Sequence, residues 1–388
     1  MISQKQFKIL EYLSKFIKIF AAVPILWDAK RGQLYTTRSL KVHHYFTFFL
    51  QLIQLVVVGI NLVKCRYVDK APYGEQAFLF IVFTTVAYAF TVSYPFVSQP
   101  EFLVVAQNAC FRYALEFQDK FMPSLDTKVH LRNRIWDSAM IAYSVLTFLV
   151  ALVGSAHIYV YPRSPLYLFS LVPSSTNIYL KTIIFIINSV AFFKCCVSLL
   201  LLCVVCSHFA ATFFILHYIQ CKEFNVGRLV NRETSDILRT FHVFPCRYRV
   251  VQLLIKYFVE IYGNILIPTQ FIIAQSIICG NYTLFRYWNE VNVVVRVFVV
   301  DVNISTVTAW FIIISWSGIC YKTSAKTVHS WKNFEFKSSY ERKIIKKFCR
   351  SCKPIALGCM GYTMTSVTAL KFLLSLIRGT FRTVLTLR

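Results

Sequence analysis

Acidic side chains are scarce in this sequence, and charged side chains of either sign are few. The 388 residues contain 17 Asp and Glu against 42 Lys and Arg, which gives a formal charge of +25. Only 15% of the residues are charged and 57% are hydrophobic, whereas soluble domains have about 25% charged and roughly 45–50% apolar residues. A soluble domain and a disordered chain are both excluded. The excess of basic residues does not indicate nucleic-acid binding, which requires a basic face on a water-soluble module.

The sequence also lacks the signatures of catalysis. His43 and His44 form the only cluster among eight histidines, so the repeated His boxes of membrane di-iron enzymes are missing. There is no Gly-rich phosphate loop, no His-Glu-x-x-His and no Gly-x-Ser-x-Gly. Cys349 and Cys352 have the spacing of half a zinc site, but no second Cys-x-x-Cys follows. We therefore expect no enzymatic activity, no cofactor and no metal.

Long apolar runs are abundant instead. Seven runs with few charges are long enough to cross a hydrocarbon core of about 30 Å. They cover residues 42–64, 77–97, 135–161, 178–219, 250–280, 291–320 and 354–387. The sequence thus predicts an all-α, multi-pass protein of the plasma membrane with seven transmembrane helices.

The fourth run is about twice as long as a membrane crossing requires. It contains no Gly and no Pro, so we expect one long helix rather than two. With that choice, the segments between the runs lie alternately on the two sides of the membrane. The N-terminal segment and the segments after runs two, four and six contain 29 Lys and Arg, whereas the segments after runs one, three and five and the C-terminal end contain seven. Because basic residues are retained in the cytoplasm, the N-terminus is expected inside and the C-terminus outside.

One glycosylation sequon agrees with this orientation. Asn281-Tyr282-Thr283 lies between the fifth and sixth runs, in a short loop that the charge count places outside. We therefore predict glycosylation at Asn281. A second sequon, at Asn303, lies within the sixth run and is not expected to be modified.

Two other classes of membrane protein remain as alternatives. A metabotropic seven-helix receptor would have an external N-terminus and Asn-Pro-x-x-Tyr in its last helix, and this sequence predicts neither. A transporter, the less favoured alternative, should show paired repeats with broken helices, and we find no internal repeat.

The last run carries the residues that point to a family. Thr380-Phe381 is followed by five residues, in which Arg382 interrupts the apolar character, and then by Leu387-Arg388. This resembles the gustatory pattern of Thr-Tyr, five apolar residues and Gln-Phe. This pattern, the layout of the helices and residues 20–34 together resemble those of the insect gustatory and odorant receptor superfamily. The resemblance implies a chemosensory, ligand-gated, non-selective cation channel, a tetramer of identical or related subunits in the lipid bilayer, opened by a small-molecule tastant or odorant.

The resemblance also implies a division of the chain. Helices four to seven are expected to extend inward and pack into a cytoplasmic anchor. The expected segments are a cytoplasmic N-terminal segment 1–41, transmembrane helices one to four in 42–216, an anchor segment 217–249, helices five and six in 250–320, an anchor segment 321–361 and a pore helix 362–388.

The gate implied by the resemblance is Val384, with Leu387 in place of the Gln. At 100° per residue, one face of the pore helix carries Ile377, Thr380, Val384 and Leu387, and a nearly opposite face carries Lys371, Ser375, Arg378 and Arg382. We expect the first face to line the pore and the basic face to meet the rest of the subunit. Alternatively, the basic face lines the conduit and favours anions.

Two further sets of residues are expected to be functional. Asp301 and Arg378 lie at similar depth in the last two helices and could neutralise each other, because unpaired charges within a membrane are costly. By resemblance, the ligand lies in the outer half of helices two to six, where aromatic rings and amides suit a small organic molecule. The candidates are Phe80, Tyr88, Phe148, His157, Phe185, Asn188, Phe271, Gln275 and Phe298.

Overall fold

The computed structural model describes most of the chain. It covers residues 4–20, 23–70, 72–122, 138, 145, 164, 167–173, 176–226, 234–240, 242–291, 293–333, 338–359 and 362–386. The elements, in chain order, are α1 (Gln4–Phe20), β1 (Leu26–Asp28), β2 (Gln33–Tyr35), α2 (Arg38–Tyr67), α3 (Tyr73–Ser98), α4 (Pro100–Phe121), η1 (Leu168–Leu171), α6 (Ile178–Glu223), η2 (Asp236–Arg239), α7 (Val243–Arg286), α8 (Val293–Ser330), η3 (Trp331–Asn333), α9 (Ser339–Ser351), β3 (Gly358–Cys359), β4 (Tyr362–Thr363) and α10 (Ser366–Thr386). The fold is all-α with two small antiparallel hairpins.

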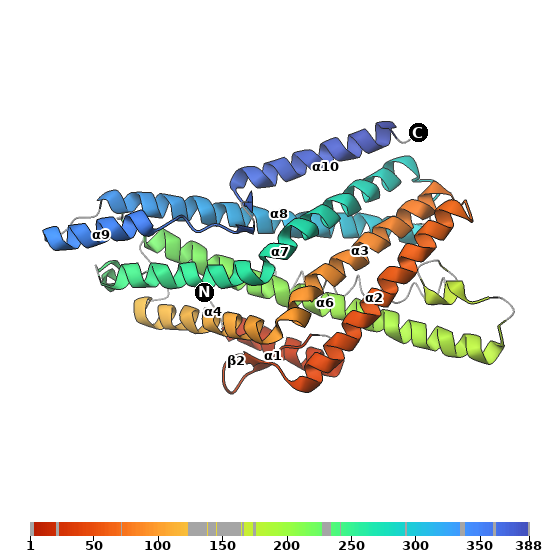
Figure 1. Cartoon of the computed structure of the whole chain (residues 1–388), viewed down its shortest axis with the longest axis horizontal. Helices are drawn as coiled ribbons and strands as arrows, with labels where there is room; N and C mark the ends of the chain where they lie inside the picture. Colours follow the sequence, from red (N-terminus) through yellow and green to blue (C-terminus); the bar gives the residue numbers. More distant parts are fainter. Residues whose placement is uncertain are drawn as a thin grey trace.

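Three long helices set the length of the molecule. α6 has 46 residues, α7 has 44 and α8 has 38, which correspond to about 69, 66 and 57 Å at 1.5 Å per residue. Figure 1 shows them side by side along the long axis. The prediction of one uninterrupted fourth helix is confirmed, and it continues four residues beyond residue 219.

The second predicted run continues into another helix. α3 ends at Ser98, the backbone of Gln99 leaves the helical conformation, and Pro100 begins α4. Proline suits the first turn of a helix because its missing N–H would have no partner there. α4 then packs against the N-terminal hairpin, where Asn108 accepts from the backbone N–H of Leu34 at 2.7 Å and donates to its carbonyl at 2.8 Å.

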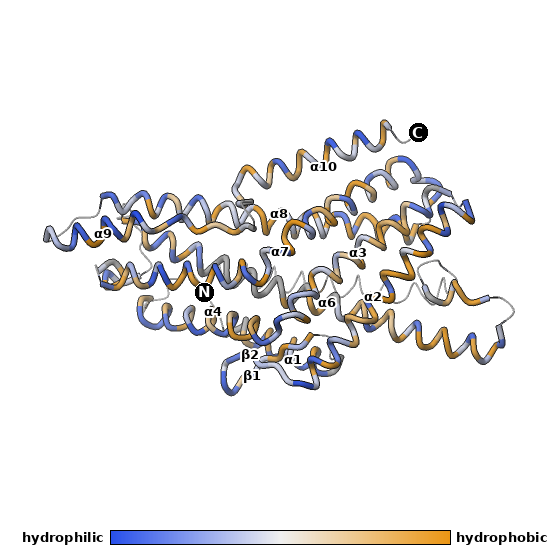
Figure 2. The backbone as a smooth tube through the Cα atoms, in the orientation of Figure 1, coloured by the Kyte–Doolittle hydropathy of each residue, from blue (hydrophilic) through white to orange (hydrophobic). Residues whose placement is uncertain are grey.

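Five helices in the described part of the chain are long and apolar enough to cross a membrane. They are Arg38–Tyr67, Gly74–Ser98, Ile178–Ser198, Val243–Arg286 and Val295–Asn333, and they match predicted runs one, two, four, five and six. Figure 2 shows apolar residues along these helices and a hydrophilic α9. The chain is therefore a multi-pass membrane protein. Apart from residues 138 and 145, the third run lies outside the described residues. α10 is not among the five.

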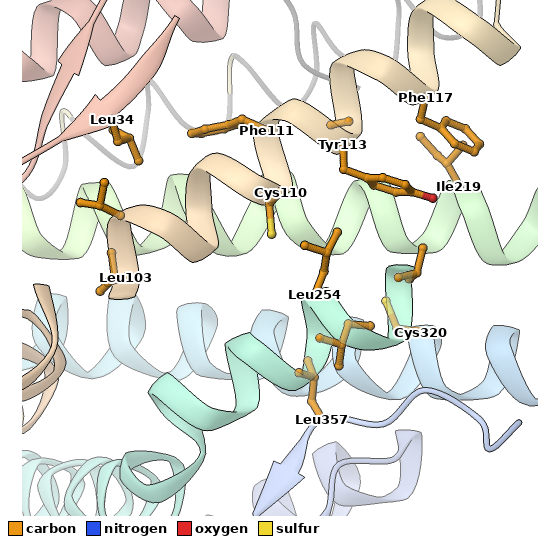
Figure 3. Close-up of a cluster of buried hydrophobic side chains, with 14 of the residues drawn as sticks. Leu34, Leu103, Cys110, Phe111, Tyr113, Phe117, Ile219, Leu254, Cys320 and Leu357 are labelled. Atoms are coloured by element: carbon orange, nitrogen blue, oxygen red, sulfur yellow. The ribbon is translucent and has the colours of Figure 1, made fainter. Parts of the chain in front are cut away.

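The end of the molecule that contains α9 has one large buried cluster, which we call the basal core. α1, β1, β2, α4, α9, residues 352–357 and the adjoining parts of α6, α7 and α8 all contribute to it. Trp331 lies edge-on to Phe244 and to Tyr248, with ring centroids 4.7 Å apart in each pair. Its Nε1 donates to the carbonyl of Phe224 at 3.0 Å. Figure 3 shows the part of this core where β2, α4, α6, α7 and α8 meet.

The opposite end, which we call the distal end, is where α2 is followed by α3 and α7 by α8. Its packing is divided among smaller clusters. One joins α2, α3 and Tyr167. Another joins Ile81 of α3 to Val291, just before α8, and to Val295 and Val299 of α8. α10 runs along the outside of α7 and α8, and its C-terminus lies at the distal end (Figure 1).

Candidate functional site

α10 is attached to the bundle by one face. Its buried residues are Ala369, Phe372, Leu376 and Thr380. The first three join a cluster with Ile273, Ile277, Trp310, Ile314 and Met364, which we call the α10 core. The spacing of three and four residues is that of a single helical stripe, so the opposite face of α10 points away from the rest of the chain.

Two glycines set how closely α10 approaches its neighbours. A Cβ on Gly318 of α8 would lie 2.4 Å from the backbone nitrogen of Ser366, where α10 begins. A Cβ on Gly379 would lie 2.5 Å from Cδ1 of Ile278 on α7. The first contact is with backbone, which cannot rotate away. Glycine is therefore required at position 318 for α10 to begin where it does.

Polar side chains from three helices form a second attachment, which we call the polar triad. Asn281 of α7 donates from Nδ2 to Oγ1 of Thr380 at 3.2 Å, and its Oδ1 accepts from Nδ2 of Asn303 at 3.1 Å. Asn303 and Thr380 are both buried. The triad joins α7, α8 and α10 near the distal end.

The predicted glycosylation residue, Asn281, belongs to this triad. The predicted loop at this position is the last part of α7, which continues to Arg286. The Asn281 nitrogen that would carry the sugar is instead bonded to Thr380, and the side chain is half-buried between helices. The apolar run ends at residue 280, and the helix continues because helical hydrogen bonding does not require apolar side chains.

The residues predicted to line the pore do not share one environment. Ile377 is 55% exposed, Val384 is half-buried, and Thr380 is buried against α7. Leu387 lies outside the described residues. Thr380, which was predicted to line the pore, therefore faces α7 in this chain. Val384 lies at the boundary between the buried and exposed faces.

The basic residues of α10 are also placed differently from the prediction. Lys371, Arg378 and Arg382 are all exposed, on the side of α10 away from the rest of the chain. Among the described residues no ion pair joins Arg378 to Asp301, which is half-buried on α8. The physical reason is the rotation of α10 about its own axis. Its buried face carries Thr380, whereas Arg378 lies on the opposite, exposed face.

Some of the predicted ligand residues come together at the distal end. Phe185 of α6 and Phe298 of α8 both pack against the cluster of α2, α3 and Tyr167. Phe185 is edge-on to Phe169 at 5.6 Å between ring centroids, and Phe298 is edge-on to Phe78 at 6.2 Å. We call these four rings the distal aromatic cluster.

The other predicted ligand residues are more scattered. Asn188 is buried on α6, one turn from Phe185, whereas Phe80, Tyr88 and Gln275 are half-buried. Phe271 is 65% exposed on α7, so this subunit does not enclose it. Phe148 and His157 lie outside the described residues.

Several contributors to the site were missed from the sequence. Tyr167 is completely buried, and Ser170 accepts from Nδ2 of Asn61 at 3.2 Å. Both belong to the short segment around η1, which carries no periodic signal. The sequence did contain a signal for the polar triad, because the amide residues Asn281 and Asn303 lie within or beside apolar runs. Such groups need partners where water is excluded.

Charged groups at the basal end fix α4 to α7. Arg247 is 2.6 Å from a carboxylate oxygen of Glu116 and lies over the ring of Phe121 at 5.4 Å. The hydrogen bond from Arg247 lowers the pKa of Glu116. Among the described residues no three His, Cys, Asp or Glu side chains are grouped to hold a metal ion. Burial raises the pKa of the Cys352 thiol to about 11, so it stays protonated at neutral pH.

Comparison with known proteins gives a result for structure alone. No family model and no curated protein matches the sequence. The structure matches that of the insect olfactory receptor OR5 from Machilis hrabei in complex with eugenol, with a TM-score of 0.66, 12% identity, and coverage of 98% of this chain and 100% of that chain. It also matches the structure of OR5 described without eugenol, with a TM-score of 0.62, 12% identity, and coverage of 98% and 97%. The chain therefore has the fold of an insect olfactory receptor.

Proposed function

We propose that this protein is a chemosensory receptor of the plasma membrane and acts as an ion channel opened by a small organic ligand. The observation that carries the proposal is the match to OR5 over 98% of the chain. OR5 is described in complex with eugenol, a small aromatic molecule. The distal aromatic cluster offers this chain comparable chemistry, with Asn188 as a buried amide one turn away.

In this proposal α10 is the helix that lines the conduit. Its composition supports that role, because it is 21 residues long, about 31 Å, yet carries three basic residues and is not among the apolar helices suited to lipid. Four copies around one axis would bring the same face of α10 together four times. The exposed apolar residues available for such contacts are Val367, Leu370, Leu374, Ile377, Phe381 and Leu385.

Val384 is our proposed gate. It lies between the exposed Ile377 and the buried Thr380 on the helix circumference, so a small rotation of α10 would change whether it faces the axis. A ring of valines blocks ions by excluding water. Val384→Ser should hydrate the constriction and raise the current without ligand.

The proposed topology follows from the charge bias and has structural support. α1 packs in the basal core with the basic helix α9, whereas Thr380 is bonded to the distal part of α7. The two ends of the chain are thus at opposite ends of the bundle. We propose that residues 1–41, 217–249 and 321–361 are cytoplasmic, the latter two forming the anchor. An epitope before Met1 should be detected only after permeabilisation.

Electrical recording tests the function directly. The chain would be expressed alone in cells with G-protein signalling blocked and exposed to a chemical panel that includes eugenol. We expect a current that rises on ligand application and persists in excised patches. A response that disappears when G proteins are blocked would identify a metabotropic receptor instead and overturn the channel proposal.

A further inference from the structure

The N-terminal module, which we define as residues 4–20 and 23–37, lies beside the start of the first membrane span. Its α1 is fixed to its hairpin, because Oγ of Ser14 accepts from the backbone N–H of Trp27 at 2.7 Å. Trp27 in turn lies edge-on to Phe111 of α4, with ring centroids 5.7 Å apart. The module leads directly into α2. Figure 1 shows it next to the start of α2, about midway along the molecule, whereas α9 lies at one end.

Several cations of this region have no acidic partner within the described part of the chain. Residues 1–41 contain eight Lys and Arg but only two acidic residues. Three of the basic side chains form ion pairs, with Glu11, with Asp28 and with Glu101 of α4. Four others, which we call the rim cations, are exposed and form no ion pair among the described residues. They are Lys8, Lys18, Lys30 and Arg38.

α1 carries its rim cations on the side away from the bundle. At 100° per residue, Lys8 and Lys18 lie about 80° apart, whereas Leu10 and Ile17, on the opposite side of the helix, are buried in the basal core. Tyr12 is on the exposed side and is 62% exposed. An exposed aromatic ring among lysines is typical of helices that lie at a membrane interface.

The start of α2 marks the level of the membrane surface. Exposed apolar side chains begin at Val42, which is 57% exposed, and continue with Phe46 and Phe49. Val42 is one turn, about 6 Å, beyond Arg38, so Arg38 lies at the level of the lipid headgroups. Lys194 of α6 marks a similar level, because its Nζ lies 5.1 Å from the centroid of the Phe46 ring. It is also about 24 Å from the distal start of α6, close to the thickness of a hydrocarbon core, about 30 Å.

We propose that the rim cations bind the headgroups of anionic phospholipids in the cytoplasmic leaflet and so hold the N-terminal module against the membrane surface. This inference rests on the topology given with the proposed function. The cytoplasmic leaflet is negatively charged, and each Lys or Arg near its surface raises the affinity about fivefold. The rim cations are complementary to it, since their own chain supplies them with no acid. α9 is also basic, but it lies at the far end of the bundle, beyond the reach of the headgroups.

The experiment measures lipid binding to the purified full-length chain in a neutral detergent. The probes are fluorescent short-chain phosphatidylserine and phosphatidylcholine. We expect the unmodified chain to prefer phosphatidylserine and to lose that preference at high salt. The rim variant combines Lys8→Gln, Lys18→Gln, Lys30→Gln and Arg38→Gln and should bind phosphatidylserine at least about tenfold more weakly. The matched control removes four exposed cations of α9 and should bind as the unmodified chain does. It combines Lys343→Gln, Lys346→Gln, Lys347→Gln and Arg350→Gln.

The unmodified chain decides the matter even if the variants do not fold. Equal binding of the two lipids would overturn the proposal. Equal weakening in the rim variant and in the α9 control would show that binding follows net charge alone, and the proposal would be wrong. Competition by glycerophosphoserine as strong as that by phosphatidylserine would identify a soluble anion as the ligand and overturn the assignment to lipid.

Failure of the channel proposal is a separate result. Lipid binding is measured without a chemosensory ligand and without a current, so a chain that conducts no ions can still confirm the role of the rim cations. An epitope before Met1 that is detected on intact cells would place the module outside the cell, and it would overturn both the proposed topology and the assignment to the cytoplasmic leaflet.

Discussion

The two ends of the same long helices are held together in different ways. In the basal core, α1, β1, β2, α4, α9, the segment 352–357 and parts of α6, α7 and α8 contribute to one cluster. Trp331 is fixed there by two edge-on aromatic contacts and a hydrogen bond to backbone. Toward the distal end, α10 is held in the described part of the chain by a small core, by close contacts at Gly318 and Gly379, and by the polar triad. Continuous packing resists displacement, whereas a helix held by few contacts can move at small cost. The basal end is therefore the scaffold, and the distal end is the part able to rearrange.

The largest effect should come from breaking the scaffold. Trp331→Ala removes a buried indole and leaves the carbonyl of Phe224 without its donor, which should cost about 3–5 kcal/mol. We expect loss of folded protein in detergent, measured by size-exclusion chromatography. Trp288→Ala, at a 49% exposed position between α7 and α8, should cost about 1 kcal/mol or less. Equal losses of folded protein from both substitutions would contradict the conclusion that the basal core is the scaffold.

A smaller effect is expected where α10 meets α8. Gly318→Ala places a methyl group against the backbone of Ser366 and should destabilise the protein by about 1–3 kcal/mol, because α10 must shift to admit it. Gly59→Ala is the control, since its methyl group would lie 3.4 Å from the ring of Phe83, an ordinary contact. Thermal unfolding of the two purified variants measures the difference. The proposed approach of α10 to α8 is wrong if Gly318→Ala unfolds at the temperature of Gly59→Ala.

The polar triad should affect gating more than folding. Thr380→Val removes the acceptor for Nδ2 of Asn281 and should cost about 1–3 kcal/mol, localised between α7 and α10. We expect normal surface expression but a shifted ligand dose–response curve. Thr383→Val is the matched control, because its hydroxyl donates only within its own helix, to the carbonyl of Gly379 at 2.8 Å. Identical dose–response curves for the two variants would show that the triad does not couple α7 to α10.

The smallest effect concerns the ion pair that joins α4 to α7. Arg247 holds the pKa of Glu116 below its ordinary value of 4.5. The stabilisation is therefore complete above that value and is lost as the pH falls through the lowered pKa of the folded state. Because Glu116 is 52% exposed, we expect less than about 1 kcal/mol. Unfolding temperatures measured between neutral and acidic pH should fall slightly less for Glu116→Gln than for the unmodified protein. A larger fall in the variant would contradict this assignment.

The sequence predicted the long elements well because their signals are local. The absence of Gly and Pro between residues 178 and 219 was enough to predict one helix, and α6 confirms it. The rotation of α10 was not predictable in the same way. A helical wheel shows which residues share a face, but it does not show which neighbour that face meets. Thr380 was therefore expected toward the pore and is bonded to Asn281 instead.

The candidate ligand site was predictable only in part, for a related reason. Phe185 and Phe298 were selected as aromatic residues of the outer half, and both reach the distal aromatic cluster. Phe169 and Tyr167 come from a short segment whose packing depends on contacts with α2 and α6, distant in sequence. Their burial is a property of the assembled bundle, and local sequence patterns do not encode it.

Cysteine accessibility along α10 tests the central claim most directly, namely that the exposed face of this helix lines a ligand-gated conduit. Leu370, Ile377 and Phe381 lie on the exposed face next to the proposed gate Val384, and Leu376 and Thr380 lie on the buried one. Each would be changed singly to Cys and exposed to a charged thiol reagent during recording, with the unmodified chain as the control for native cysteines. The account predicts that the reagent alters the ligand-gated current at the first three positions and not at the last two. Modification at Leu376→Cys and Thr380→Cys, without effect at Ile377→Cys and Phe381→Cys, would contradict it.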